Sequence, residues 1–102
     1  QWLASMVKMA GSVELDDGAV RVLRESGRSL LPVGVCGVSG DFSRGDMVSC
    51  RDSAGVEVAR GLVNYGAEDT RRIMGSASQA IEEILGFQGE EELIHRDNLV
   101  LV

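Results

Sequence analysis

The chain has 102 residues, of which 44% are hydrophobic and 25% charged, and its 10 basic and 16 acidic side chains give a net charge of −6. This composition is typical of one small globular domain and is too apolar for intrinsic disorder. The longest uncharged stretch, residues 29–40, is broken by Pro32 and three glycines, so we expect no membrane span. The negative charge argues against a protein whose affinity comes from neutralising many phosphates.

The first part of the chain predicts a helix, a short strand and a second helix. Apolar residues in 2–9 have helical spacing without a capping residue before them, so we interpret this segment as the end of a helix that begins in missing sequence. Residues 12–15 alternate like a strand. Asp16 and Asp17 then provide an N-cap and a negative first turn for a helix that we expect Gly27 to terminate.

The middle of the chain predicts three strands joined by glycine-containing turns. Pro32 forces the residue before it into an extended conformation. The valines and glycines that follow, to Gly40, are typical of a strand that bends. The other predicted elements are a turn at 42–46, a strand at 47–51, a hairpin loop at 52–55 and a returning strand at 56–65.

The pattern changes to helix beyond Gly66. The predicted elements are a helix that Gly75 stops, a helix with a capping box at 76–79 that Gly86 ends, an acidic loop at 89–92 and a strand at 99–102. The chain has 13 glycines and as many valines. These features predict a mainly β domain with short helices, folded as a small closed or half-closed barrel.

The sequence offers no clear catalytic or metal-binding constellation. The glycine-rich segment 34–45 lacks the Gly-Lys-Ser/Thr ending of a phosphate-binding loop. No nucleophile is evident near His95, which we interpret as structural. Cys36 and Cys50 lie in apolar stretches and lack the further ligands of a zinc site, so we expect buried free thiols, with a disulfide as the alternative. We predict no catalytic residue, no cofactor-binding residue and no metal ligand in this chain.

Three arginines are the best candidate for a binding surface. Arg21, Arg24 and Arg28 fall at i, i+3 and i+7, so a helix places them on one outer stripe. A plain solvated helix surface is the alternative. The stripe gains support as a site if Arg44 or Arg51 lies beside it. The last third of the chain carries most of the negative excess, so a basic face on the rest remains open.

A second candidate surface is apolar and lies at the start of the chain. Trp2, Leu3 and Met6 either pack on the domain or face a partner domain. We favour the second alternative and predict an inter-domain contact at these residues.

The order of several short motifs resembles one family. The motifs are LLPVGV at 30–35, GDFSRGD at 40–46, ARGLVNY at 59–65, RRIMG at 71–75, ILGF at 84–87 and HRDNL at 95–99. Spread over residues 10–101, they resemble the C-terminal PUA domain of bacterial glutamate 5-kinase.

This resemblance implies a PUA-like pseudo-barrel over residues 10–102 and a connector helix over residues 1–9. The connector would lead from an N-terminal amino-acid-kinase domain of the same chain. The implied parent is a cytoplasmic homo-oligomeric enzyme that transfers the γ-phosphate of ATP to the side-chain carboxylate of glutamate, the first step of proline synthesis. ATP and magnesium would bind in its kinase domain. The present domain would act without catalysis, in regulation, domain packing or assembly.

The resemblance also implies an alternative, an RNA-binding module. RNA-binding PUA domains use the first helix and the adjoining glycine-containing strand, which correspond here to Arg21, Arg24, Arg28 and Gly34. With Arg44, these residues are the predicted RNA or partner surface.

Overall fold

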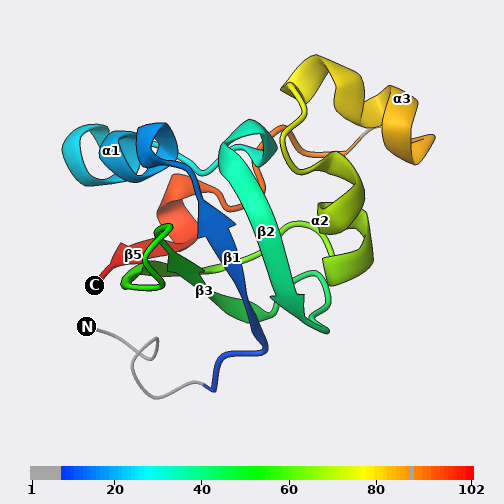
Figure 1. The fold of residues 1–102 in the computed structure, drawn as a ribbon. Helices are drawn as coiled ribbons and strands as arrows, with labels where there is room; N and C mark the ends of the chain where they lie inside the picture. The colour runs from blue at the N-terminus through cyan, green and yellow to red at the C-terminus, as the bar shows by residue number, and fades with distance from the viewer. Residues whose placement is uncertain (1–7, 88) are drawn as a thin grey trace.

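Five strands form one mixed sheet in the computed structural model, which describes residues 8–87 and 89–102 (Figure 1). The strands are β1 (Gly11–Leu15), β2 (Val35–Gly40), β3 (Met47–Arg51), β4 (Glu57–Leu62) and β5 (Leu99–Leu101). Their order in the sheet is β2-β1-β3-β4-β5. Strands β1 and β3 are parallel, and the other neighbouring pairs are antiparallel.

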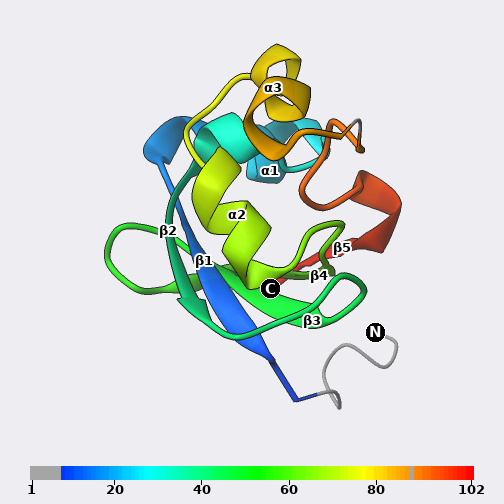
Figure 2. The same ribbon diagram turned by 90° about the vertical axis from the view of Figure 1, so that its right-hand side faces the viewer.

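Within residues 8–87 and 89–102, three short α-helices and three 3₁₀ turns surround the sheet. They are α1 (Asp17–Ser26), η2 (Pro32–Gly34), α2 (Ala67–Ile73), η3 (Ser78–Ala80), α3 (Ile81–Leu85) and η4 (Arg96–Asn98). Helix α1 follows β1 directly and stands at one end of the sheet (Figure 1). Helix α2 lies over one face of the sheet, with α3 next to it (Figure 2).

The core lies between the sheet and these helices. Val13 of β1 and Val48 and Cys50 of β3 project from the same face of the sheet, as their pairing register requires. They belong to one buried cluster with Leu23 of α1 and Ile73 of α2, and each of these five residues is at most 2% exposed. Burial of this apolar surface is the main stabilising contribution to the fold.

The two edges of the sheet are connected outside the strands. Leu30, which precedes β2, forms an isolated antiparallel bridge with Ile94, which precedes β5. The Leu30 N–H donates to the carbonyl of Ile94 at 2.9 Å, and the Leu93 N–H donates to the carbonyl of Leu30 at 2.8 Å. An open sheet is thereby partly closed into a barrel. The predicted mainly β fold with short helices is confirmed.

Several element ends lie where the sequence predicts them. Asp16 caps α1, with its Oδ1 accepting from the Ala19 N–H at 2.7 Å. Gly27 and Gly86 end α1 and α3 with φ of 60° and 84°. Gly55 has φ of 84° in the β3–β4 hairpin. Glycine is favoured at these three positions because left-handed backbone carries a steric cost for residues with a Cβ.

Two strand predictions are wrong in extent. Strand β4 ends at Leu62 rather than at Tyr65, because the Asn64 N–H donates to the carbonyl of Leu93 at 2.7 Å and leads the chain away from the ladder. Val33 was expected in a strand but lies in η2 and is 50% exposed.

The capping-box prediction is also wrong. The N-cap residue of η3 is Ala77, which makes no side-chain hydrogen bond, and α3 begins only at Ile81. At the other end of the chain, Lys8 and Met9, the described part of the predicted connector helix, are not helical.

The two cysteines differ in their surroundings. Both are free, so the alternative of a disulfide between them is excluded. Cys50 is buried in the central strand β3, as expected. Cys36 is exposed, because it follows the buried Val35 in β2 and successive side chains of a strand point to opposite faces. Burial raises the pKa of the Cys50 thiol to about 12. Partial desolvation, followed by the charge of Glu14, also raises the pKa of Cys36.

Candidate functional site

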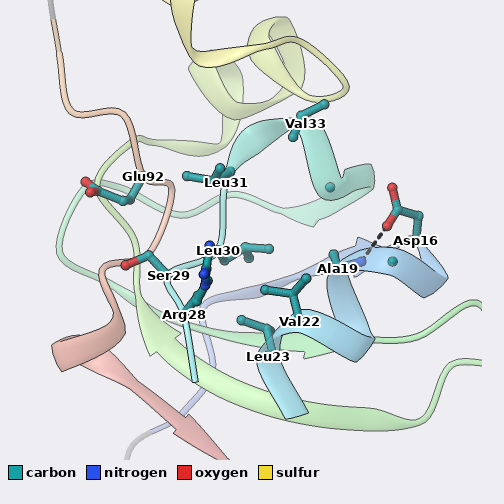
Figure 3. A pocket seen from close by; sticks show the side chains of 12 residues that line it. Asp16, Ala19, Val22, Leu23, Arg28, Ser29, Leu30, Leu31, Val33 and Glu92 are labelled. Carbon is teal, nitrogen blue, oxygen red and sulfur yellow. Dashed lines mark hydrogen bonds between the residues drawn. The ribbon is translucent and has the colours of Figure 1, made fainter. Parts of the chain in front are cut away.

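A groove of about 560 Å³ lies between α1 and η2, and the loop joining them contributes to its lining. Ala19, Val22 and Leu23 project toward it from α1, and Leu31 and Val33 lie on the side of η2 (Figure 3). It is a hollow open to solvent rather than an enclosed cavity.

A close approach of backbone elements forms this groove. Leu31 is extended, with φ of −98° and ψ of 151°, because Pro32 follows it. The chain then turns through η2 to Gly34. A Cβ atom on Gly34 would lie 2.6 Å from the Cβ of Ala19, far inside the ordinary carbon–carbon contact distance of about 3.5–4.0 Å. The missing side chain therefore lets η2 pack directly against α1.

The lining of the groove is mainly apolar. Leu23 and Leu30 are buried beneath it. Val22, Leu31 and Val33 remain 40%, 39% and 50% exposed. Val22 is exposed because its side of α1 borders the open groove. Three large apolar side chains thus share one solvent-accessible hollow.

The charged residues of the groove are mostly acidic. Asp16 and Glu92 line it together with Arg28. The Asp16 carboxylate is already engaged as the cap of α1. Glu92 belongs to the predicted acidic loop, and its backbone carbonyl accepts from the Asn64 side chain at 2.9 Å. The groove therefore has two carboxylates and one guanidinium at its border.

The structure brings together two of the residues predicted as an RNA or partner surface. Arg28 and Gly34 both line the groove, but Gly34 is buried and acts in packing. Arg21 and Arg24 are exposed on α1 and are not part of the lining.

Arg44 lies in a different place. It is in the β2–β3 loop, at the opposite end of the sheet from α1 (Figure 1). There it borders a second hollow with Tyr65 and Phe87, and its guanidinium pairs with Glu90 Oε2 at 3.0 Å. Arg51 donates to the carbonyl of Gly55 at 3.0 Å in its own hairpin. The arginine stripe thus receives no support from Arg44.

The predicted inter-domain contact, Trp2, Leu3 and Met6, lies outside the described residues.

His95 has a structural role, because its Nδ1 accepts a hydrogen bond from the Asp97 N–H at 3.1 Å and caps η4. Among residues 8–87 and 89–102, no group of three or more His, Cys, Asp and Glu side chains is arranged to hold a metal ion. No helix in this same part of the chain is long and apolar enough to cross a membrane.

The apolar character of the groove was not predicted from the sequence. Leu31 and Val33 flank Pro32, and the only local signal there is that proline forces Leu31 into an extended conformation. The contribution of Glu92 had no local signal, since it lies far along the chain from α1.

Comparison with known families agrees with this fold. The model of the PUA domain matches residues 11–85, which include strands β1 to β4 and helices α1, α2 and α3. The chain therefore belongs to the PUA domain family.

Among curated proteins, the chain is similar to enzymes named glutamate 5-kinase. It is 64% identical over 101 residues to that of Halorhodospira halophila, and this match covers 99% of the chain and 27% of the relative. It is 61% identical over 102 residues to that of Nitrosococcus oceani, covering 100% of the chain and 27% of the relative. The chain thus spans about a quarter of the length of the curated relatives it matches.

Solved structures show the same fold at low sequence identity. A PUA domain from Aeropyrum pernix K1, in a tartrate complex, has a TM-score of 0.62 at 23% identity, covering 84% of this chain and 41% of that one. The archaeal box H/ACA sRNP Nop10-Cbf5 complex contains a chain with a TM-score of 0.57 at 19% identity, covering 95% of this chain and 28% of that one.

Proposed function

We propose that this chain is a non-catalytic accessory domain of a glutamate 5-kinase. One observation carries the proposal: 64% identity to such an enzyme extends over 99% of this chain but over 27% of the enzyme. The described residues offer neither a phosphate-binding loop nor a metal-binding cluster. In this proposal, ATP and magnesium bind in an N-terminal kinase domain of the parent, which transfers the γ-phosphate of ATP to the glutamate side chain.

The proposed role of the domain is regulation, domain packing or assembly within a cytoplasmic, homo-oligomeric parent. The exposed apolar groove supports such a role, since contiguous exposed apolar surface commonly marks an interaction site. Trp2, Leu3 and Met6 are proposed as a further contact with the kinase domain.

Two assays test the accessory role. The 102-residue chain, incubated with ATP, magnesium and glutamate, is expected to give no phosphoryl transfer. Deletion of residues 10–102 from the parent is expected to leave turnover but to change its response to regulators or its assembly. Turnover by the isolated chain would refute the proposal, and a truncated parent that is fully active and unchanged in regulation and assembly would refute the accessory role.

RNA binding is the second candidate function. Arg28 lines the groove, and Arg21 and Arg24 are exposed on the same helix. One solved structure with this fold is an H/ACA RNP bound to a substrate RNA, with a TM-score of 0.50. Titration of a structured RNA at low and moderate salt tests this candidate, because phosphate-driven binding weakens steeply as salt rises. Absence of binding at low salt would exclude it.

A further inference from the structure

The groove between α1 and η2 extends beyond the hollow described above. Leu31 and Val33 also border an adjoining hollow of about 440 Å³, on the side of η3, which includes Ala77 and Glu91. The two exposed apolar side chains are therefore shared by both hollows and form a ridge between them. We call the two hollows together the η2 trough.

The apolar content of the trough is its first distinguishing feature. Val22, Leu31 and Val33 gather there, whereas the exposed Val56 and Phe87 lie outside it. Side chains such as Leu or Ile can bury these three residues, and burial contributes about 25 cal/mol per Å² of apolar surface removed from water. A phosphate backbone cannot do this.

Charge is the second feature. Asp16, Glu91 and Glu92 line the trough against one cation, Arg28. The acidic loop that carries two of these carboxylates is held in place by hydrogen bonds to its backbone. The Asn64 side chain donates to the Glu92 carbonyl at 2.9 Å. The Tyr65 hydroxyl donates to the carbonyl of Glu90, which also belongs to the loop. The negative charge therefore stays at the border of the trough.

We propose that the η2 trough binds a polypeptide segment in which apolar side chains are flanked by Lys or Arg. The apolar side chains cover the ridge of Leu31 and Val33, and the cations meet the carboxylates of the acidic loop. Complementary charge of this kind favours a basic partner and disfavours a nucleic acid, because three carboxylates and one guanidinium line the trough.

A binding assay with four matched variants tests the proposal. The probe is a fluorescently labelled synthetic peptide in which Leu and Lys alternate, measured by anisotropy with the 102-residue chain. Val33→Ser and Glu92→Gln are each expected to weaken binding about fivefold or more. Val56→Ser and Glu68→Gln are the controls, because these exposed residues lie outside the trough, and they should change the affinity less than twofold.

Two further probes decide between partner classes. A peptide in which Leu and Glu alternate is expected to bind far more weakly than the Leu/Lys peptide. A structured RNA hairpin is expected not to displace the Leu/Lys peptide. The proposal is overturned if the control variants weaken binding as much as the trough variants, which indicates general attraction to an acidic protein. It is also overturned if the Leu/Glu peptide binds equally well or if the RNA displaces the peptide. Thermal melting of each variant confirms that a loss of binding is not a loss of fold.

Discussion

A single methyl group at Gly34 is expected to separate the two walls of the groove. In the Gly34→Ala variant the new Cβ would lie 2.6 Å from the Cβ of Ala19. Neither side chain can rotate away, because both are methyl groups fixed to backbone. Helix α1 and η2 must therefore move apart by about 1 Å to reach a normal contact distance.

The cost of this displacement can be put at about 2 kcal/mol, within the range of roughly 1–3 kcal/mol for an overpacked site. In a domain of this size, 1 kcal/mol corresponds to a shift in Tm of about 4–8 °C. We therefore expect the Tm of Gly34→Ala to fall by roughly 8–16 °C. Gly18→Ala is the matched control, because its Cβ would meet only Asp16 Oδ1 at 3.5 Å. It should be neutral or slightly stabilising, since alanine is the better helix former.

A compensating substitution separates this contact from other causes. Ala19→Gly removes the opposing methyl group and by itself costs about 1 kcal/mol in helix propensity. In the double variant the clash is absent, so its destabilisation should stay near about 1 kcal/mol, which corresponds to a coupling of about 2 kcal/mol between the two sites.

Thermal and urea unfolding of the four proteins, including the unmodified chain, measure the cycle. Additive destabilisation in the double variant would show that the Ala19 contact is not what excludes a side chain at Gly34. An unchanged Tm for Gly34→Ala would show that α1 moves away from η2 without cost. Either result refutes the account of how the groove is formed.

Two further predictions concern ionisable groups. Near neutral pH, the native protein should react with one thiol-reactive label, at Cys36. The reaction should be slower than that of an unhindered cysteine, because the pKa of the Cys36 thiol is raised. Denaturant should expose Cys50 to a second label, and mass spectrometry counts the adducts. Two labels on the native protein would contradict the buried position of Cys50. Hydrogen bonds from Arg60, at 2.9 and 3.0 Å, lower the pKa of Glu57 below its ordinary value of about 4.3. The interaction between Glu57 and Arg60 stabilises the fold above the ordinary pKa of the glutamate, and this stabilisation is lost as the pH falls through the folded-state pKa. Glu57→Gln should therefore lower the Tm at neutral pH and have little effect in strong acid. An equal fall in Tm at both pH values would argue against the ion pair.

The sequence alone determined the features that depend on neighbouring residues. Asp16 caps the helix that follows it, and Gly27, Gly55 and Gly86 lie at positive φ where the chain turns. The predicted strand at 47–51 has the bounds of β3. These features depend on backbone conformation and local hydrogen bonds, which a short stretch of sequence specifies. The order of the short motifs likewise resembles that of a PUA domain, and the fold agrees with it.

Tertiary structure decided which of those residues share a surface. The parallel pairing of β1 with β3, and the bridge from Leu30 to Ile94, join segments that are distant in sequence. The same long-range packing separated Arg44 from Arg28, left Val22 exposed and brought Glu92 to the groove. Residue type and periodicity determine on which side of a helix or strand a residue lies. Which neighbour covers that side depends on the packing of the whole chain, because the free energy of burial depends on contacts between remote segments.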